Sequence, residues 1–101
     1  MFVEKFGANW QQKVEVMAEE IRGRLEASGR RGQLGLMDLR IEKKFGTLVV
    51  GGSASGLVQD IVAKFKKDID GTCEVCGQQG RAISAGGYWR TVCDEHLKEA
   101  A

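Results

Sequence analysis

Residues 73–96 read CEVCGQQGRAISAGGYWRTVCDEH. This stretch has the form Cys-x-x-Cys, a spacer of sixteen residues, and Cys-x-x-His, and it uses all three cysteines and the only histidine of the chain. Tetrahedral Zn²⁺ takes four thiolate or imidazole ligands, and two close pairs joined by a short spacer bring four donors together at little cost in loop entropy. We therefore expect one structural zinc ion, with iron as the alternative metal, bound by Cys73, Cys76, Cys93 and His96.

The residues around these ligands predict a small zinc finger. Gly77 directly follows the second cysteine, where a glycine relieves crowding in the turn of a zinc knuckle. Residues 81–85 and 88–92 flank Gly86-Gly87, a pair that favours the tight turn of a β-hairpin. The acidic residues of 93–101 suit the first turn of a short helix. Knuckle, hairpin and helix are the order of a treble-clef finger, and a zinc ribbon is the alternative.

The sequence before the finger predicts a first helix over residues 10–28. Asn9 is the expected N-cap, with Gln12 reaching back to it, and Gly29 offers the left-handed conformation that ends helices. Apolar residues recur every three or four positions, which is typical of one buried helix face. These expected core residues are Trp10, Val14, Met17, Ile21 and Leu25.

A hairpin and a second helix are expected next, after a polar connection at 29–35. Alternating apolar residues at 37, 39 and 41 predict one strand, residues 47–50 predict another, and the link 43–46 contains a glycine for the turn. Ser53 or Ser55 is the expected cap of a helix that runs to about Asp70. On this second helix, Asp60 and Lys64 are expected to form an ion pair. Its predicted apolar face consists of Leu57, Val58, Ile61, Val62, Phe65 and Ile69.

The predicted fold class is α+β. An α-β-β-α layer over residues 1–70 is followed by the finger over residues 71–101, and the two are expected to form one cooperative unit. A chain of 101 residues with 43% hydrophobic residues and a net charge of +1 is suited to a single folded domain. No apolar run approaches the roughly 20 residues that span a bilayer, and acidic Glu4 does not suit a signal peptide. We expect a cytoplasmic protein.

The ligand set argues against catalysis. A catalytic zinc keeps one position open for water, whereas four protein ligands form a closed site. A centre of three cysteines and water would resemble that of nucleotide deaminases, but the His-x-Glu element of those enzymes is absent from the sequence. Haem attachment would need histidine at position 77, which is glycine, and the only histidine and every thiol are assigned to the metal. The sequence therefore predicts a protein that is not an enzyme.

Three segments together resemble a group of small proteins of unknown function that bacteriophages and prophages encode. They are IEKKFGTL at 41–48, CEVCGQQG at 73–80 and GYWRTVCDEH at 87–96, and the resemblance extends over residues 10–97. Thr47 and Val50 depart from it, since the group tends to have glycine and an aromatic residue there. The resemblance implies a bacterial or phage setting and an accessory function, such as inhibition of a host enzyme or of a defence system, including anti-CRISPR action.

A protein partner is the first functional expectation, because the net charge is near neutral. Three thiolates and one Zn²⁺ together add −1 to the formal +1, which weakens bulk attraction to nucleic acid. The alternative is a nucleic-acid-binding module with a contact patch of two arginines and two aromatic residues. We expect Trp89 to pack against the helix of the finger rather than to stack on a base. The four patch residues are Arg81, Tyr88, Trp89 and Arg90. The identity of the partner, the source organism and the oligomeric state stay open.

Overall fold

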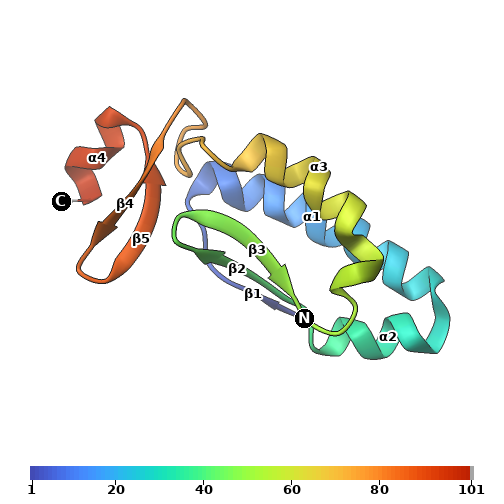
Figure 1. The fold of residues 1–101 in the computed structure, drawn as a ribbon. Helices are drawn as coiled ribbons and strands as arrows, with labels where there is room; N and C mark the ends of the chain where they lie inside the picture. The colour runs from blue at the N-terminus through green and yellow to red at the C-terminus, as the bar shows by residue number, and fades with distance from the viewer. Residues whose placement is uncertain (101) are drawn as a thin grey trace.

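Helices and short strands follow one another along an elongated chain of 47 × 23 × 17 Å (Figure 1). The computed structural model describes residues 1–100 and, for residues 85 and 98–100, the backbone alone. The fold is mixed α/β. In chain order its elements are β1 (Phe2–Val3), α1 (Ala8–Ala27), α2 (Gly29–Met37), β2 (Arg40–Lys44), β3 (Thr47–Gly51), the 3-10 turn η1 (Ser55–Val58), α3 (Gln59–Ile69), β4 (Arg81–Ala85), β5 (Tyr88–Val92) and α4 (Asp94–Ala100).

The N-terminal layer, residues 1–70, packs α1 and α3 on one face of a three-stranded sheet (Figure 1). The strand order is β1-β2-β3, with β1 parallel and β3 antiparallel to β2, and β1 is a strand that the sequence did not predict. Every apolar residue predicted for the face of α1 is buried. The buried side chains of this core are Trp10, Val14, Met17, Ile21, Leu25, Leu39, Ile41, Leu48, Ala54, Val58, Ile61 and Ile69. Burial of each large apolar side chain stabilises the layer by about 1.5–3 kcal/mol.

The expected polar connection after α1 is wrong, because residues 29–37 form the helix α2. Gly29 has a φ of 74° and, as predicted, ends α1, but a second helix begins at the same residue. A Cβ atom at Gly32 would lie 1.9 Å from the carbonyl oxygen of Leu25. Gly32 therefore permits the close packing of α2 against α1. Met37 belongs to α2 and is 77% exposed, so the expected strand starts later, at Arg40.

The predicted N-caps of the helices are also wrong. Gly7, not Asn9, is the N-cap of α1, and no side chain caps this helix. Neither Ser53 nor Ser55 caps the second predicted helix, which consists of η1 followed by α3. Instead, the backbone N–H and the hydroxyl of Ser53 donate to the carboxylate of Asp38. Tertiary partners thus replace the local ones that the sequence suggested.

The expected pair within α3 is replaced by two pairs between helices. Asp60 accepts from Arg24 of α1 at 3.0 Å, and Lys64 donates to Glu20 of α1 at 2.9 Å. Both pairs are solvent-exposed, so water screens their attraction and they contribute little to stability. Leu57, expected on the apolar face of the second helix, lies in η1 and is 42% exposed.

The predicted hairpin forms between β2 and β3, but the expected link 43–46 is too long: β2 continues through Lys44, which pairs with Thr47, and the turn is Phe45-Gly46 alone. Both residues have positive φ, 54° and 82°, as a type I′ turn requires. The turn abuts the C-terminal part of the chain, residues 71–100. A Cβ atom at Gly46 would lie 2.6 Å from the Cβ of Ala82, and the hydroxyl of Thr91 donates to the carbonyl oxygen of Gly46 at 2.6 Å. A side chain at position 46 would therefore separate the two parts.

The C-terminal part consists of a turn after Cys73, the predicted β4–β5 hairpin and α4. Pairing of Ala85 with Tyr88 leaves Gly86 and Gly87 as the turn, with φ of 58° and 86°. Among residues 1–100, no helix combines the length and apolar composition needed to cross a membrane.

Candidate metal centre

The structure brings the side chains of Cys73, Cys76, Cys93 and His96 together, with all four donor atoms within 4.8 Å of one another. The Nδ1 atom of His96 lies 3.5 Å from the Sγ of Cys73 and 3.2 Å from the Sγ of Cys93. The Sγ atoms of Cys76 and Cys93 are 3.6 Å apart. A tetrahedral zinc ion with bonds of about 2.3 Å to sulfur and 2.0 Å to nitrogen requires donor separations of roughly 3.5–3.8 Å. The Cys73–His96 and Cys76–Cys93 separations lie within this range and the Cys93–His96 separation is slightly shorter, so the cluster is compatible with a four-coordinate metal.

Local backbone geometry presents the first ligand pair. The N–H of Gly77 donates to the carbonyl oxygen of Cys73 at 2.9 Å, and Gly77 has a φ of 83°. A β-bridge between Thr72 and Gln79 closes this turn. A Cβ at Gly80 would lie 2.9 Å from the backbone nitrogen of Cys73. The two glycines therefore permit a turn that most side chains would block.

The second ligand pair stands at the start of α4. Cys93 follows β5 directly, and the N–H of Leu97 donates to its carbonyl oxygen at 2.8 Å, which closes the first helical turn. Residues three apart on a helix share one face, so His96 lies beside Cys93. Cys73 and Cys93 are buried together with Val92, and Leu97 packs against this small cluster.

Backbone N–H groups prepare Cys73 to bind a cation. Burial by itself raises the pKa of the Cys73 thiol, but hydrogen bonds from the backbone of Cys76, Cys93 and Val75 lower it to about 6. The hydrogen bond to Cys93 raises the pKa of His96 above its ordinary value, which reflects the anionic character of the neighbouring thiolates. Since the thiolate is the metal-binding form, Cys73 is ready to coordinate at neutral pH, and it loses this form as the pH falls through about 6.

Glu74, between the first two ligands, is a buried carboxylate that joins the two parts of the chain. It is 2% exposed, and the Nζ of Lys43 donates to both of its oxygens at 3.0 Å. The same carboxylate accepts from the backbone N–H groups of Gly7 and Thr91 at 3.1 Å. A buried charge is stable only when it is paired and hydrogen-bonded, and Glu74 meets both conditions.

The backbone of the metal-binding turn also caps α1. The carbonyl oxygen of Glu74 accepts from the N–H groups of Asn9 and Trp10 at 2.8 and 3.1 Å. The indole N–H of Trp10 donates to the backbone oxygen and the hydroxyl of Thr72, at 3.1 and 3.0 Å. Trp10 is fully buried, as predicted. The first turn of α1 and the first ligand pair therefore support each other.

Sequence reasoning missed Glu74 and Lys43, although one signal was available. Leu39, Ile41 and Lys43 lie on one face of the strand region, and the first two are buried apolar residues. Because Lys43 continues this buried face, its ammonium group is expected to lie at the edge of the core and to need a carboxylate partner.

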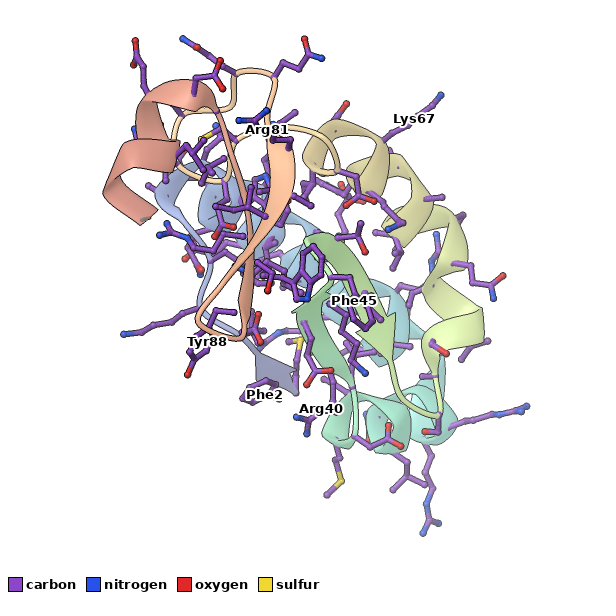
Figure 2. The ribbon with its side chains drawn as sticks, turned by 60° about the vertical axis from the view of Figure 1, so that its left-hand side comes forward. Phe2, Arg40, Phe45, Lys67, Arg81 and Tyr88 are labelled. Carbon is purple, nitrogen blue, oxygen red and sulfur yellow. The ribbon has the colours of Figure 1, made fainter. Side chains whose placement is uncertain are left out.

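The structure separates one residue of the predicted contact patch from the other three. Arg81 pairs with Val92 at the end of the β4–β5 hairpin opposite Tyr88 (Figure 2). Its guanidinium lies 3.7 Å from the carboxylate of Asp94. Tyr88, Trp89 and Arg90 lie toward the hairpin turn and border a common groove. Trp89 is 38% exposed and its ring meets that of Phe45, and among the described side chains it is not part of the buried cluster that Leu97 of α4 joins.

In comparisons with known proteins, no family model, curated protein or solved structure matches the chain. Residues and geometry are therefore the basis of the functional assignment.

Proposed function

We propose that the chain is a small, non-enzymatic binding protein whose C-terminal part is a treble-clef-like finger with one structural zinc ion. The convergence of three thiolates and one imidazole within 4.8 Å is the observation that supports this proposal. Four protein donors complete the tetrahedral shell of zinc, so the metal has a structural role and leaves no position for substrate. The order of turn, hairpin and helix agrees with the treble clef.

Zinc content is the direct test of the metal proposal. We expect elemental analysis of purified protein to find about one zinc per chain, since the ligand set forms one closed site. The Cys76→Ser variant should contain much less. Glu95→Ala, which changes an exposed residue in the same region, is the control and should keep the wild-type content. A wild-type protein with iron in place of zinc would contradict the assignment.

A protein is the first candidate partner. Leu34 of α2 and Leu57 of η1 are 57% and 42% exposed and line a pocket of about 390 Å³. Exposed apolar side chains gathered at a pocket are typical of interaction sites. The resemblance to phage and prophage proteins extends the proposal to a cytoplasmic role in a bacterial cell, with inhibition of a host enzyme or of a defence system such as CRISPR-Cas.

Affinity capture from a bacterial lysate tests this candidate when matched variants are compared. A specific partner of the apolar pocket should be retained by the wild-type protein and lost from Leu34→Glu, because a carboxylate in an apolar interface must be desolvated. Val16→Glu changes a residue of α1 that is 55% exposed and lies outside the pocket, and it should retain the partner. Identical captured proteins for all three would argue against this surface.

Nucleic acid is the second candidate partner. The observation that favours it is the groove bordered by Tyr88, Trp89 and Arg90, because cations and aromatic rings from both parts of the chain meet there.

A further inference from the structure

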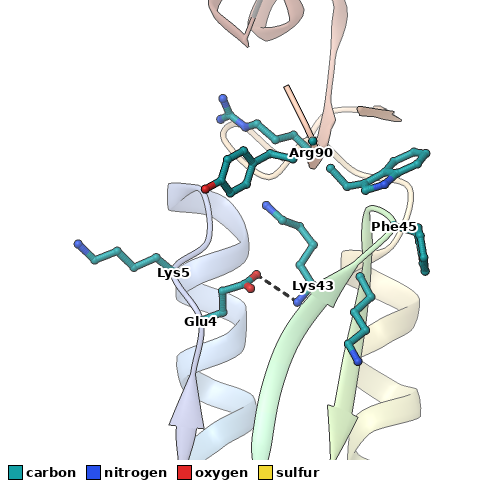
Figure 3. A pocket seen from close by; sticks show the side chains of 9 residues that line it. Glu4, Lys5, Lys43, Phe45 and Arg90 are labelled. Atoms are coloured by element: carbon teal, nitrogen blue, oxygen red, sulfur yellow. Dashed lines mark hydrogen bonds between the residues drawn. The ribbon is translucent and has the colours of Figure 1, made fainter. Parts of the chain in front are cut away.

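A groove of about 540 Å³ lies where the turns of the two hairpins approach the N-terminal strand segment (Figure 3). Neither the N-terminal layer nor the C-terminal part forms it alone. Its lining residues are Glu4, Lys5, Lys43, Lys44, Phe45, Gly87, Tyr88, Trp89 and Arg90. In Figure 3, Lys5 and Phe45 stand on opposite sides of the groove, Lys43 lies between them, and Arg90 comes from the finger hairpin.

Three aromatic rings line the groove and remain accessible to solvent. Phe45, Tyr88 and Trp89 are 71%, 78% and 38% exposed. The rings of Phe45 and Trp89 meet edge to face, with centroids 5.8 Å apart and planes at 73°. This arrangement holds two rings at a defined angle and leaves ring surface available for stacking.

Phe45 occupies a position that stability alone does not favour. Among residues 1–100 it is the only residue other than glycine that has a positive φ, 54°. Asparagine or glycine is the usual residue there, because a bulky side chain in the left-handed region is strained. Since the ring is 71% exposed, its burial does not offset this strain. Such strain is typical of positions that serve binding.

The cations of the groove outnumber its single carboxylate. Lys43 is already paired with Glu74, while Lys5, Lys44 and Arg90 form no ion pair with the residues that the structure describes. The carboxylate of Glu4 accepts from the backbone N–H of Lys43 at 3.2 Å. The groove thus offers three available positive charges beside its rings, although the whole protein is close to neutral.

We propose that this groove binds single-stranded nucleic acid, with unpaired bases against Phe45, Tyr88 and Trp89 and phosphates near Lys5, Lys44 and Arg90. Aromatic platforms next to cations are how proteins bind single strands without reading their sequence. An acidic peptide would pair with the cations but would leave the ring faces unused. A duplex is also a poorer ligand, because its bases are already stacked on one another and cannot stack on the rings. The inference rests on the proposed binding role and names the ligand class for it.

Fluorescence anisotropy with labelled 12-nucleotide dT and U oligomers tests the proposal on zinc-loaded protein. Binding should weaken by roughly 20-fold between 50 and 200 mM salt, the value expected for about three phosphate contacts on a single strand. The affinities for dT and U report whether the ligand is DNA, RNA or both. A duplex of equal length and a poly-glutamate peptide should compete poorly.

Variants separate the groove from general charge effects. Phe45→Ala should weaken binding about tenfold, as expected for loss of one stacked base, whereas Phe45→Tyr should bind like the wild type. Lys44→Ala should weaken binding and reduce the salt slope, while Lys67→Ala, an exposed lysine of α3 outside the groove, should change neither. Phe45→Gly should weaken binding as much as Phe45→Ala and yet keep or raise the melting temperature, because glycine tolerates the positive φ.

Three results would overturn the proposal: no binding of either oligomer at 50 mM salt, binding that Phe45→Ala leaves unchanged, or equal competition by the duplex or poly-glutamate. None of these results would contradict the proposed zinc site or the proposed role of the apolar pocket. Failure of the structural-zinc proposal would instead appear as low zinc content in the wild-type protein.

Discussion

Replacement of Glu74 with alanine should lower the free energy of unfolding of the zinc-loaded protein by about 3–5 kcal/mol. The change leaves the Lys43 ammonium, whose side chain is 13% exposed, without its partner. It also removes the acceptor of the backbone N–H groups of Gly7 and Thr91. A domain of this size is stable by about 5–15 kcal/mol, so the loss is a large fraction of the total. Urea unfolding followed by circular dichroism measures it.

The matched control is Glu20→Ala, which breaks another Glu–Lys pair. Glu20 and Lys64 are 41% and 60% exposed, so water screens their attraction and the expected loss is at most about 1 kcal/mol. Glu74→Gln should fall between these two variants, because the amide oxygen retains one acceptor but not the charge. A loss below 1 kcal/mol for Glu74→Ala would show that Lys43 and the two N–H groups find other partners.

Removal of the metal should destabilise the N-terminal layer as well as the C-terminal part. Cys93→Ser, or a strong chelator, removes the ion that holds β5 and α4 near the first ligand pair, and structural zinc binding is coupled to folding. The turn that contains Glu74 then loses its support, and with it the cap on the first turn of α1. If 3–5 kcal/mol of contacts are lost, the melting temperature of the layer should fall by at least about 12 °C.

Thermal unfolding should therefore show one cooperative transition with zinc, and the helical signal, dominated by α1 and α3, should move to lower temperature without it. Glu95→Ala is the control, because it alters the same region as Cys93→Ser and leaves the ligands in place. The result that would contradict this expectation is a helical transition whose midpoint does not change with chelator. In that case residues 1–70 would be an independent folding unit.

Features that depend on neighbours in the sequence could be predicted. The face of α1 followed from helical periodicity, because each of its buried residues is three or four positions from the next. The two hairpins followed from strand-forming runs separated by glycine-containing turns, since turn conformation is a local property. Gly29 ended α1 as expected for the same reason.

Features that depend on distant segments could not be predicted. Residues 29–35 were expected to be a polar connection, yet they belong to α2, where Gly32 and Gly35 face Leu25 and Ala54 too closely for any side chain. Asn9 looked like a cap because its side chain is suited to that role, but the carbonyl oxygen of Glu74 accepts from the helix N–H groups instead. In both cases a tertiary contact outweighed a local preference.

The sequence by itself determined the candidate ligand set, because zinc selects thiolate and imidazole donors and the two ligand pairs lie within 24 residues. Only the tertiary structure decided what surrounds it. Lys43 meets Glu74 across 31 positions, and Phe45 reaches Trp89 from a different hairpin. Contacts of this kind leave little trace in a single sequence, because they depend on how elements pack rather than on the residues beside them.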